Sequence, residues 1–128
     1  LVSRGLGDVY KRQPQATFGY LAEQLNQYNL AYLHVVEGDM MTGERQMDYR
    51  KLRDTFTSLY MANNGYDYDR ATQALANGDA DLVSFGRIYL ANPDLPERFK
   101  QGAALNEPDM ETFYGGDEHG YTDYPTLS

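Results

Sequence analysis

Three short apolar runs, separated by segments with helical periodicity, constrain the fold of this chain more than any other feature of its sequence. The runs start near Leu30, Ser58 and Asp81, so that successive starts lie 28 and 23 residues apart. Around them, apolar residues recur at intervals of three and four, as on a helix with one buried face. Alternation of strands and helices on this scale predicts right-handed βαβ crossovers and a parallel sheet.

The first two helices are predicted by apolar stripes. The stripe residues are Phe18, Leu21, Ala22 and Leu25 in a helix over residues 16–26, and Tyr49, Leu52 and Phe56 in a second helix. The first apolar run, residues 30–36, is almost continuously apolar, which is typical of a strand covered on both faces in a parallel sheet. We therefore expect this strand to be buried.

Turn and capping residues mark the third helix. Asn63-Asn64-Gly65 stops the second run, at residues 58–62, and can adopt left-handed backbone angles. Asp67 or Asp69 is expected to cap the helix that follows, and Gly78 to end it. The third run, Leu82-Val83-Ser84-Phe85, comes directly after this helix.

The last third of the chain has weaker signals. Asn92-Pro93 predicts the cap and the first-turn proline of a short helix that includes Leu95 and Phe99. The tail from about Leu105 is rich in Tyr, Gly, Asp and Pro and has no period of either kind. Such a tail can cover a site, but a wrap over the surface is the favoured interpretation.

The spacing of the runs is close to the roughly 30 residues per unit of a (β/α)8 barrel of about 250 residues. With 128 residues the chain is too short to close one. Three strands would leave two open sheet edges, which a natural domain must cover, pair or charge. The sequence therefore predicts an α/β portion of a barrel, and we expect the remaining strands to lie outside this chain.

Composition and charge exclude several functions. Lys and Arg total 11 against 19 Asp and Glu, and a net charge of −8 repels the phosphate backbone of nucleic acid. The absence of cysteine excludes disulfides and thiolate sites and is consistent with the cytoplasm. The longest apolar run is far short of the roughly 20 residues that cross a bilayer, so no membrane segment is expected. Residues 1–13 lack the apolar stretch of a secretory signal.

Two glycine-containing pairs, Asn64-Gly65 and Gly86-Arg87, follow the second and third runs. In barrels a phosphate is frequently held by the loops after strands 7 and 8, where exposed backbone N–H groups favour an anion. Both glycines let the backbone come close, and Arg87 adds a planar charged fork suited to phosphate oxygens. On spacing alone, turn glycines and a solvated charge remain the favoured interpretation, because a Gly-Arg pair is a weak motif.

Other polar residues are weaker candidates. His34 and Glu37 could suggest a metal or an acid/base pair, but two ligands do not make a site, and a hydrogen-bonded barrel histidine is favoured. His119 lies beside Asp117 and Glu118 and is expected to be solvated. We therefore expect no metal site. For most of the 12 tyrosines, packing with a hydroxyl at the surface is sufficient explanation.

Several linked motifs, in order, resemble the end of the old yellow enzyme family, especially its N-ethylmaleimide reductase-like alkene reductases. They are LAYLHVVE (30–37), MANNGY (61–66), ADLVSFGRIYLANPDL (80–95), LN (105–106), TFYGG (112–116) and GYTDYP (120–125). The match runs from Thr17 to the end of the chain. The order of the motifs is more specific than any one of them.

The resemblance implies a (β/α)8 TIM barrel with non-covalent FMN, which is reduced by NAD(P)H and passes hydride to a small electron-poor alkene. The strands here would be the sixth to eighth. Asn64 and Gly65 match the seventh-strand phosphate loop, Gly86 and Arg87 match the eighth-strand phosphate ligands, and Tyr114 matches an aromatic residue near flavin and substrate. Residues 14–128 would be the carboxy-terminal part of the FMN barrel.

Several functional residues that the family carries on its earlier strands have no counterpart in this chain. The paired substrate-anchoring His/Asn residues, the tyrosine proton donor and the groups around the flavin ring are missing, so the chain alone is expected to be inactive. Residues 1–13 match nothing in the family and resemble a translated sequencing or assembly artefact. The alternative is a non-catalytic partial barrel that self-associates and binds a phosphorylated ligand. Another phosphate-binding barrel enzyme would explain Gly86-Arg87 but not the Tyr114 segment.

Overall fold

The computed structural model describes residues 13–128, which form two compact units, one ending at Ser84 and the other running from Phe85 to Ser128. The interpretation of residues 1–13 as foreign to the family falls, apart from Gln13, outside the described residues. Within residues 13–128, no helix is long and apolar enough to cross a bilayer.

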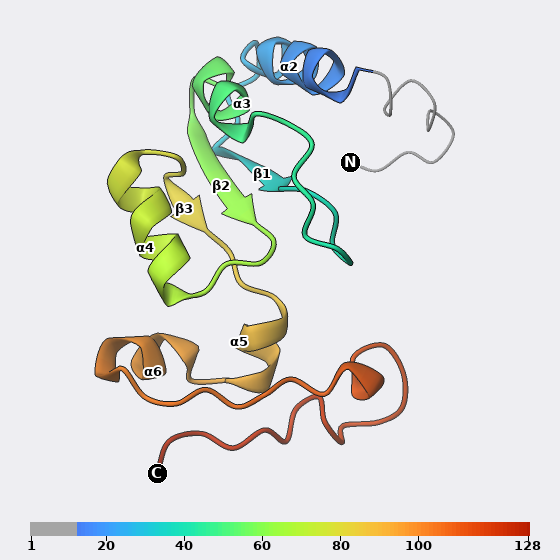
Figure 1. Cartoon of the computed structure of the whole chain (residues 1–128), viewed down its shortest axis with the longest axis vertical. Helices are drawn as coiled ribbons and strands as arrows, with labels where there is room; N and C mark the ends of the chain where they lie inside the picture. The colour runs from blue at the N-terminus through green and yellow to red at the C-terminus, as the bar shows by residue number, and fades with distance from the viewer. Residues whose placement is uncertain (1–12) are drawn as a thin grey trace. The chain divides into compact units, whose positions relative to one another are not determined.

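The first unit contains a parallel sheet with the strand order β1-β2-β3 (Figure 1). The strands are β1 (Tyr32–Val36), β2 (Leu59–Asn63) and β3 (Leu82–Val83). Helix α3 (Tyr49–Thr55) connects β1 to β2, and α4 (Tyr68–Asn77) connects β2 to β3. The predicted α/β alternation and the parallel sheet are confirmed.

The register brings the carboxyl ends of the strands to one edge of the sheet. Val36 pairs with Asn63, and Ala62 pairs with Val83. The amide of Ser84 donates to the carbonyl of Ala62 at 2.9 Å, which continues the ladder one residue past β3. The chain therefore leaves β2 toward Asn64 from the same edge at which β3 ends.

Helix α2 (Pro14–Leu25) confirms the first predicted helix and packs beside α3. Its proline lies in the first turn, where no intrahelical N–H is required. Asn26, which ends the helix, donates from its side chain to the carbonyl of Thr55 at 2.9 Å and accepts from the amide of Thr57 at 2.9 Å. These two bonds tie the end of α2 to the end of α3.

The core of the first unit is built from β2 and its flanking helices. Its most buried apolar side chains include Leu52, Phe56, Tyr60, Ala62, Ala71 and Ala74. Strand β1, in contrast, alternates between exposed and half-buried residues, with Tyr32 49% and Val36 46% exposed. The expectation that this strand is covered on both faces is wrong for the described chain, because Tyr32, His34 and Val36 share one face of β1 and all three are exposed.

Helix α4 begins and ends at two of the predicted residues. The side chain of Asp67 accepts a hydrogen bond of 2.8 Å from the amide of Arg70, so Asp67 rather than Asp69 is the N-cap. Gly78 adopts φ 72°, the left-handed conformation that ends a helix with little strain in glycine.

The second unit contains α5 (Arg87–Ala91), α6 (Leu95–Gln101) and a short 3-10 helix at Met110–Thr112. The expectation that Asn92-Pro93 caps the last helix is wrong. Asn92 instead ends α5, where its side-chain amide donates to the carbonyl of Ile88 at 2.8 Å. Asp94 precedes α6, and Pro96 lies in the first turn of that helix.

The tail is attached to α6 by buried polar groups. Arg98 is 5% exposed and donates to the carbonyls of Ala104 and Pro125 at 2.6 and 2.9 Å. Near the end of the chain, the amide of Leu127 donates to the Asp94 carboxylate at 2.7 Å. The tail without periodicity is therefore ordered by hydrogen bonds to α6 and to the residue that precedes it.

Candidate functional site

The turn after β2 has an unusual backbone. Asn64 has φ 91° and is the one non-glycine residue with positive φ within residues 13–128, and Gly65 follows with φ 69°. These angles confirm the predicted left-handed turn. The main-chain N–H groups of Asn64 and Gly65 donate to no acceptor among the described residues. Two adjacent N–H groups in left-handed geometry are the kind of donor that binds an anion.

The side-chain amide of Asn64, unlike its main-chain N–H, already has hydrogen-bond acceptors. Its amide donates to the carbonyls of Glu37 and Asp39 at 2.8 and 3.1 Å. Any role of Asn64 toward a phosphate therefore rests on its main-chain N–H. The side chain attaches the turn to the loop that follows β1.

The other side of the turn is held by Arg70. Its guanidinium donates to the carbonyl of Gly65 at 2.9 Å and lies over the ring of Tyr66, 4.5 Å from the ring centroid. A Cβ at Gly65 would come within 3.2 Å of this guanidinium. Glycine thus serves both the backbone angle and the close approach of Arg70.

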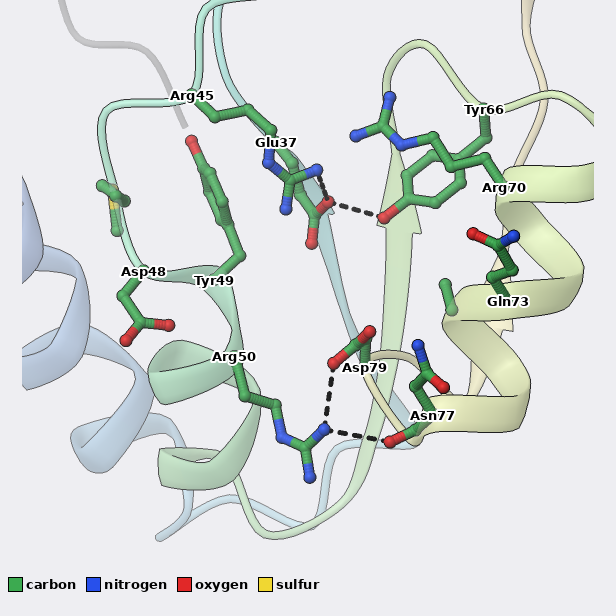
Figure 2. A pocket seen from close by; sticks show the side chains of 12 residues that line it. Glu37, Arg45, Asp48, Tyr49, Arg50, Tyr66, Arg70, Gln73, Asn77 and Asp79 are labelled. Carbon is green, nitrogen blue, oxygen red and sulfur yellow. Dashed lines mark hydrogen bonds and ion pairs between the residues drawn. The ribbon is translucent and has the colours of Figure 1, made fainter.

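A buried carboxylate lies next to the turn (Figure 2). Glu37 is 3% exposed and accepts hydrogen bonds from Tyr60 at 2.9 Å, Tyr66 at 2.7 Å and Arg45 at 2.7 Å. Figure 2 shows the last two of these donors beside the carboxylate. Both carboxylate oxygens have donors, as a buried charge requires. Arg45 also lies over the ring of Tyr49, 4.7 Å from its centroid. We call Glu37, Arg45, Tyr60 and Tyr66 the Glu37 cluster.

The two phenols of the cluster are protonated donors. Burial, followed by the charge and hydrogen bond of Glu37, raises the pKa of Tyr60 far above its ordinary value. Burial also raises the pKa of Tyr66, with the hydrogen bond to Glu37 as the next cause. Because a phenolate beside a carboxylate is disfavoured, both hydroxyl groups stay neutral and donate to Glu37.

Sequence patterns did not reveal this cluster. The interpretation of tyrosines as packed rings with surface hydroxyls fails for Tyr60 and Tyr66, whose hydroxyls are directed at Glu37. Glu37 and His34 do not form a pair: the His34 imidazole lies 2.8 Å from the hydroxyl of Ser84 instead. The one sequence signal was a glutamate directly after an apolar strand.

A polar hollow of about 400 Å³ opens between α3 and α4 beside the Glu37 cluster (Figure 2). An ion pair crosses it, in which Arg50 donates to the Asp79 carboxylate at 2.9 Å. Arg50 also donates to the main-chain carbonyl of Asn77 at 3.0 Å. No buried side-chain nitrogen or oxygen of the described residues lacks a partner. The hollow therefore presents no unpaired buried polar atom to a ligand.

The second pair of candidate residues begins the second unit. Gly86 precedes α5, and Arg87 is the first residue of that helix. A Cβ at Gly86 would meet no heavy atom within 4 Å, so the space beside it is open. Packing among the described residues does not require a glycine at this position. A glycine would, however, allow a ligand to come close to the backbone.

Tyr114 is 96% exposed, and its ring meets the edge of the buried Phe113 at a centroid distance of 6.1 Å. His119, predicted to be solvated, is exposed and pairs with Asp123 at 2.9 Å. Within residues 13–128, no three His, Asp or Glu residues gather as metal ligands.

Comparison with known proteins identifies the family of the chain. Residues 13–106 match the model of the NADH:flavin oxidoreductase / NADH oxidase family, and the chain belongs to this family. A rice (Oryza sativa subsp. japonica) protein named putative 12-oxophytodienoate reductase 5 is 44% identical over 126 residues, covering 94% of this chain and 34% of its own length.

Two solved structures support the same assignment. Morphinone reductase in complex with tetrahydroNAD is 48% identical with a TM-score of 0.78, covering 91% of this chain and 31% of its own. The old yellow enzyme from Trypanosoma cruzi is 36% identical with a TM-score of 0.85, and the match covers 91% of this chain and 31% of that protein. The resemblance to old yellow enzymes and the partial TIM-barrel fold are thereby confirmed. The chain spans about a third of the length of these relatives.

Proposed function

We propose that this chain is the carboxy-terminal part of an FMN-dependent NAD(P)H:alkene oxidoreductase and supplies the phosphate end of its flavin site. Membership of a flavin oxidoreductase family supports the cofactor. The observation that carries the assignment of the site is the left-handed turn at Asn64-Gly65, whose two main-chain N–H groups have no acceptor among the described residues.

The donors present fit a phosphate. Asn64 and Gly65 offer neutral N–H groups at the carboxyl edge of the sheet, where barrel enzymes bind phosphates. Gly86 leaves open space beside the backbone at the start of α5, and Arg87 contributes a permanent positive charge at that helix. These four residues are the ones that would hold the FMN phosphate, and Tyr114 would lie near flavin and substrate.

The bound flavin supplies hydride to the electron-poor C=C bond of a small alkene. The chain's own contribution is to hold and orient the cofactor at its phosphate. Morphinone reductase, one of the similar proteins, has been solved in complex with tetrahydroNAD, which supports a nicotinamide as the reductant here. The substrate-anchoring residues and proton donor expected of the family have no counterpart in these 128 residues, so we expect the chain alone to be inactive.

The test is recovery of the coding sequence upstream of this chain, followed by expression of the complete protein. We expect the upstream frame to encode the first part of a flavin barrel and to join before Thr17. We expect the purified protein to contain FMN and to oxidise NAD(P)H when an electron-poor alkene such as a maleimide is added. An upstream frame without a flavin-barrel segment would defeat the proposal.

Equilibrium dialysis of the 128-residue chain with FMN separates this proposal from a self-associating binding module. Little or no FMN should bind, because flavin affinity also needs a pocket for the ring, and no such pocket is provided by a phosphate loop alone. Micromolar affinity of the isolated chain would favour the module. The exposed Tyr32, Val36 and Leu59 of the open sheet would then be expected in a contact between copies.

A further inference from the structure

Three side chains attach the Asn64-Gly65 turn to the rest of the first unit. The Asn64 side chain reaches the carbonyl of Glu37, Arg70 holds the carbonyl of Gly65, and Tyr66 donates its hydroxyl to the Glu37 carboxylate. Glycine accepts a positive φ freely, but at Asn64 a φ of 91° is uncommon for a residue with a side chain and needs support from its surroundings. Its conformation therefore depends on these attachments.

Two of the three attachments end on Glu37, one on its carbonyl and one on its carboxylate. The third is connected to it as well, because the Arg70 guanidinium lies over the ring of Tyr66. Figure 2 shows Tyr66 reaching the carboxylate from one side and Arg45 from the other. Glu37 is thus the common anchor of the turn.

The contacts of Glu37 do not suggest chemistry of its own. Its carboxylate is 2% exposed and has donors on both oxygens, leaving no atom for a reacting group. The buried hydroxyl of Tyr60 and the charge of Arg45 compensate the carboxylate for the loss of water. A buried, fully bonded carboxylate is suited to holding neighbouring segments in one geometry.

We propose that Glu37 is a positioning residue for the cofactor phosphate: through Tyr66 and its own carbonyl it holds the N–H groups of Asn64 and Gly65 in the anion-binding arrangement. The inference rests on the proposed function, because it assumes that this turn binds the FMN phosphate. It adds a buried acidic residue that does not touch the ligand yet determines how well the ligand's phosphate is bound.

The sign of the effect separates positioning from simple electrostatics. Glu37→Gln removes a negative charge near the turn, and a through-space charge effect alone would then strengthen the binding of a phosphate. Loss of the anchor predicts the opposite, because glutamine cannot accept from Tyr60, Tyr66 and Arg45 together. Weaker binding of the phosphate in this variant therefore indicates positioning.

The experiment compares FMN with riboflavin, which has the same ring but no phosphate, in the complete protein. The dissociation constant of each flavin is measured by fluorescence quenching for wild type, Glu37→Gln and the control Glu44→Gln, an exposed glutamate in the loop after β1. We expect the preference for FMN over riboflavin to fall about tenfold in Glu37→Gln and to be unchanged in Glu44→Gln. A general loss of folding would weaken both flavins equally.

The outcomes distinguish the inference from the proposed function. A wild-type protein that binds both flavins equally would contradict the phosphate site itself and the inference with it. A wild-type preference for FMN that Glu37→Gln retains would overturn only the positioning role. Equal weakening of both flavins in Glu37→Gln would also overturn it, since the residue would then be merely structural.

A second variant covers the case in which Glu37→Gln does not fold. Tyr66→Phe keeps the ring under Arg70 and keeps the Glu37 charge paired with Arg45 and Tyr60, but it breaks the bond between carboxylate and turn. We expect a smaller loss of FMN preference and a changed ³¹P chemical shift of bound FMN. An unchanged shift and preference would overturn the proposal.

Discussion

The side-chain amide of Asn64 donates a hydrogen bond of 2.8 Å to the main-chain carbonyl of Glu37 and so joins the turn after β2 to the end of β1. A second bond from the same amide reaches the carbonyl of Asp39 at 3.1 Å. Asparagine tolerates the left-handed conformation better than most residues, and here it also supplies these two bonds. The residue therefore combines a backbone role with a side-chain role.

Two substitutions of Asn64 separate these roles. Asn64→Gly removes both hydrogen bonds but accepts φ 91° without strain, whereas Asn64→Ala removes the bonds and adds strain. We expect both variants to be less stable than wild type, with Asn64→Ala lower than Asn64→Gly by about 1 kcal/mol. Urea unfolding measures the difference. Equal stability of the two variants would show that the backbone angle costs nothing here.

Arg87 is the residue at which a substitution should affect the cofactor most directly. In the complete protein, Arg87→Ala should weaken FMN binding by about 1.5–3 kcal/mol, because a charge-assisted contact with the phosphate is lost. Riboflavin binding should not change. Arg87→Lys is the matched control: it keeps the charge but not the planar fork, and should recover part of the affinity. Unchanged FMN affinity in Arg87→Ala would mean that this phosphate assignment is wrong.

The elements of the first unit could be predicted because their signals are local. The left-handed turn at Asn64-Gly65, the Asp67 cap and the Gly78 end of α4 each depend on a few neighbouring residues, and the structure has them at the expected positions. The error at Asn92-Pro93 has a physical reason. Asn92 is 0% exposed, and its side chain accepts from the amide of Asn106 at 2.7 Å, a contact that no local pattern contains.

The Glu37 cluster could not be predicted for the same reason. Its donors lie 8, 23 and 29 residues away along the chain, at Arg45, Tyr60 and Tyr66. A glutamate after an apolar strand is compatible with a solvated charge, a metal ligand or a buried anchor. Only the folded chain, which brings the three donors to the carboxylate, identifies Glu37 as a buried anchor. By contrast, position along the sequence is enough to propose phosphate-site residues, because the ends of parallel strands share one edge.

The carboxyl group of Asp94 gives a pH-dependent attachment for the end of the chain. The amide of Leu127, followed by the Arg98 side chain, lowers the pKa of Asp94 below its ordinary value of 3.8. A lowered pKa means that the carboxylate stabilises the folded form above pH 3.8, and that this contribution is lost as the pH falls through the folded-state value. We expect the end of the chain to detach only below about pH 3.8.

The amide proton of Leu127 reports this titration, since it donates to Asp94 at 2.7 Å. With ¹⁵N-labelled leucine, its chemical shift should change with a midpoint below 3.8. Asp94→Asn should abolish the titration at Leu127. Glu107→Gln, a change at an exposed carboxylate of the same unit, should leave it unaltered. A midpoint above 3.8 would contradict the assignment of Asp94 as the acceptor.

Arg98 should be sensitive to substitution because its buried guanidinium holds three separate segments. It donates to Asp94, to the carbonyl of Ala104 and to the carbonyl of Pro125, at 2.8, 2.6 and 2.9 Å, from three different nitrogens. Lysine carries one nitrogen and cannot reproduce this planar arrangement. Arg98→Lys should therefore leave the Ala104 carbonyl without its side-chain donor and the Pro125 carbonyl with Asn106 alone, at a cost of about 1–2 kcal/mol.

The loss should be local, because the acceptors of Arg98 all lie within the second unit. Hydrogen exchange followed by mass spectrometry should show faster exchange in residues 104–127 of Arg98→Lys, while the strands of the first unit exchange as in wild type. Lys100→Arg, a conservative change at an exposed position of the same helix, is the control. Equal protection of the tail in both variants would show that the apolar contacts of the tail, such as buried Phe113, hold it without Arg98.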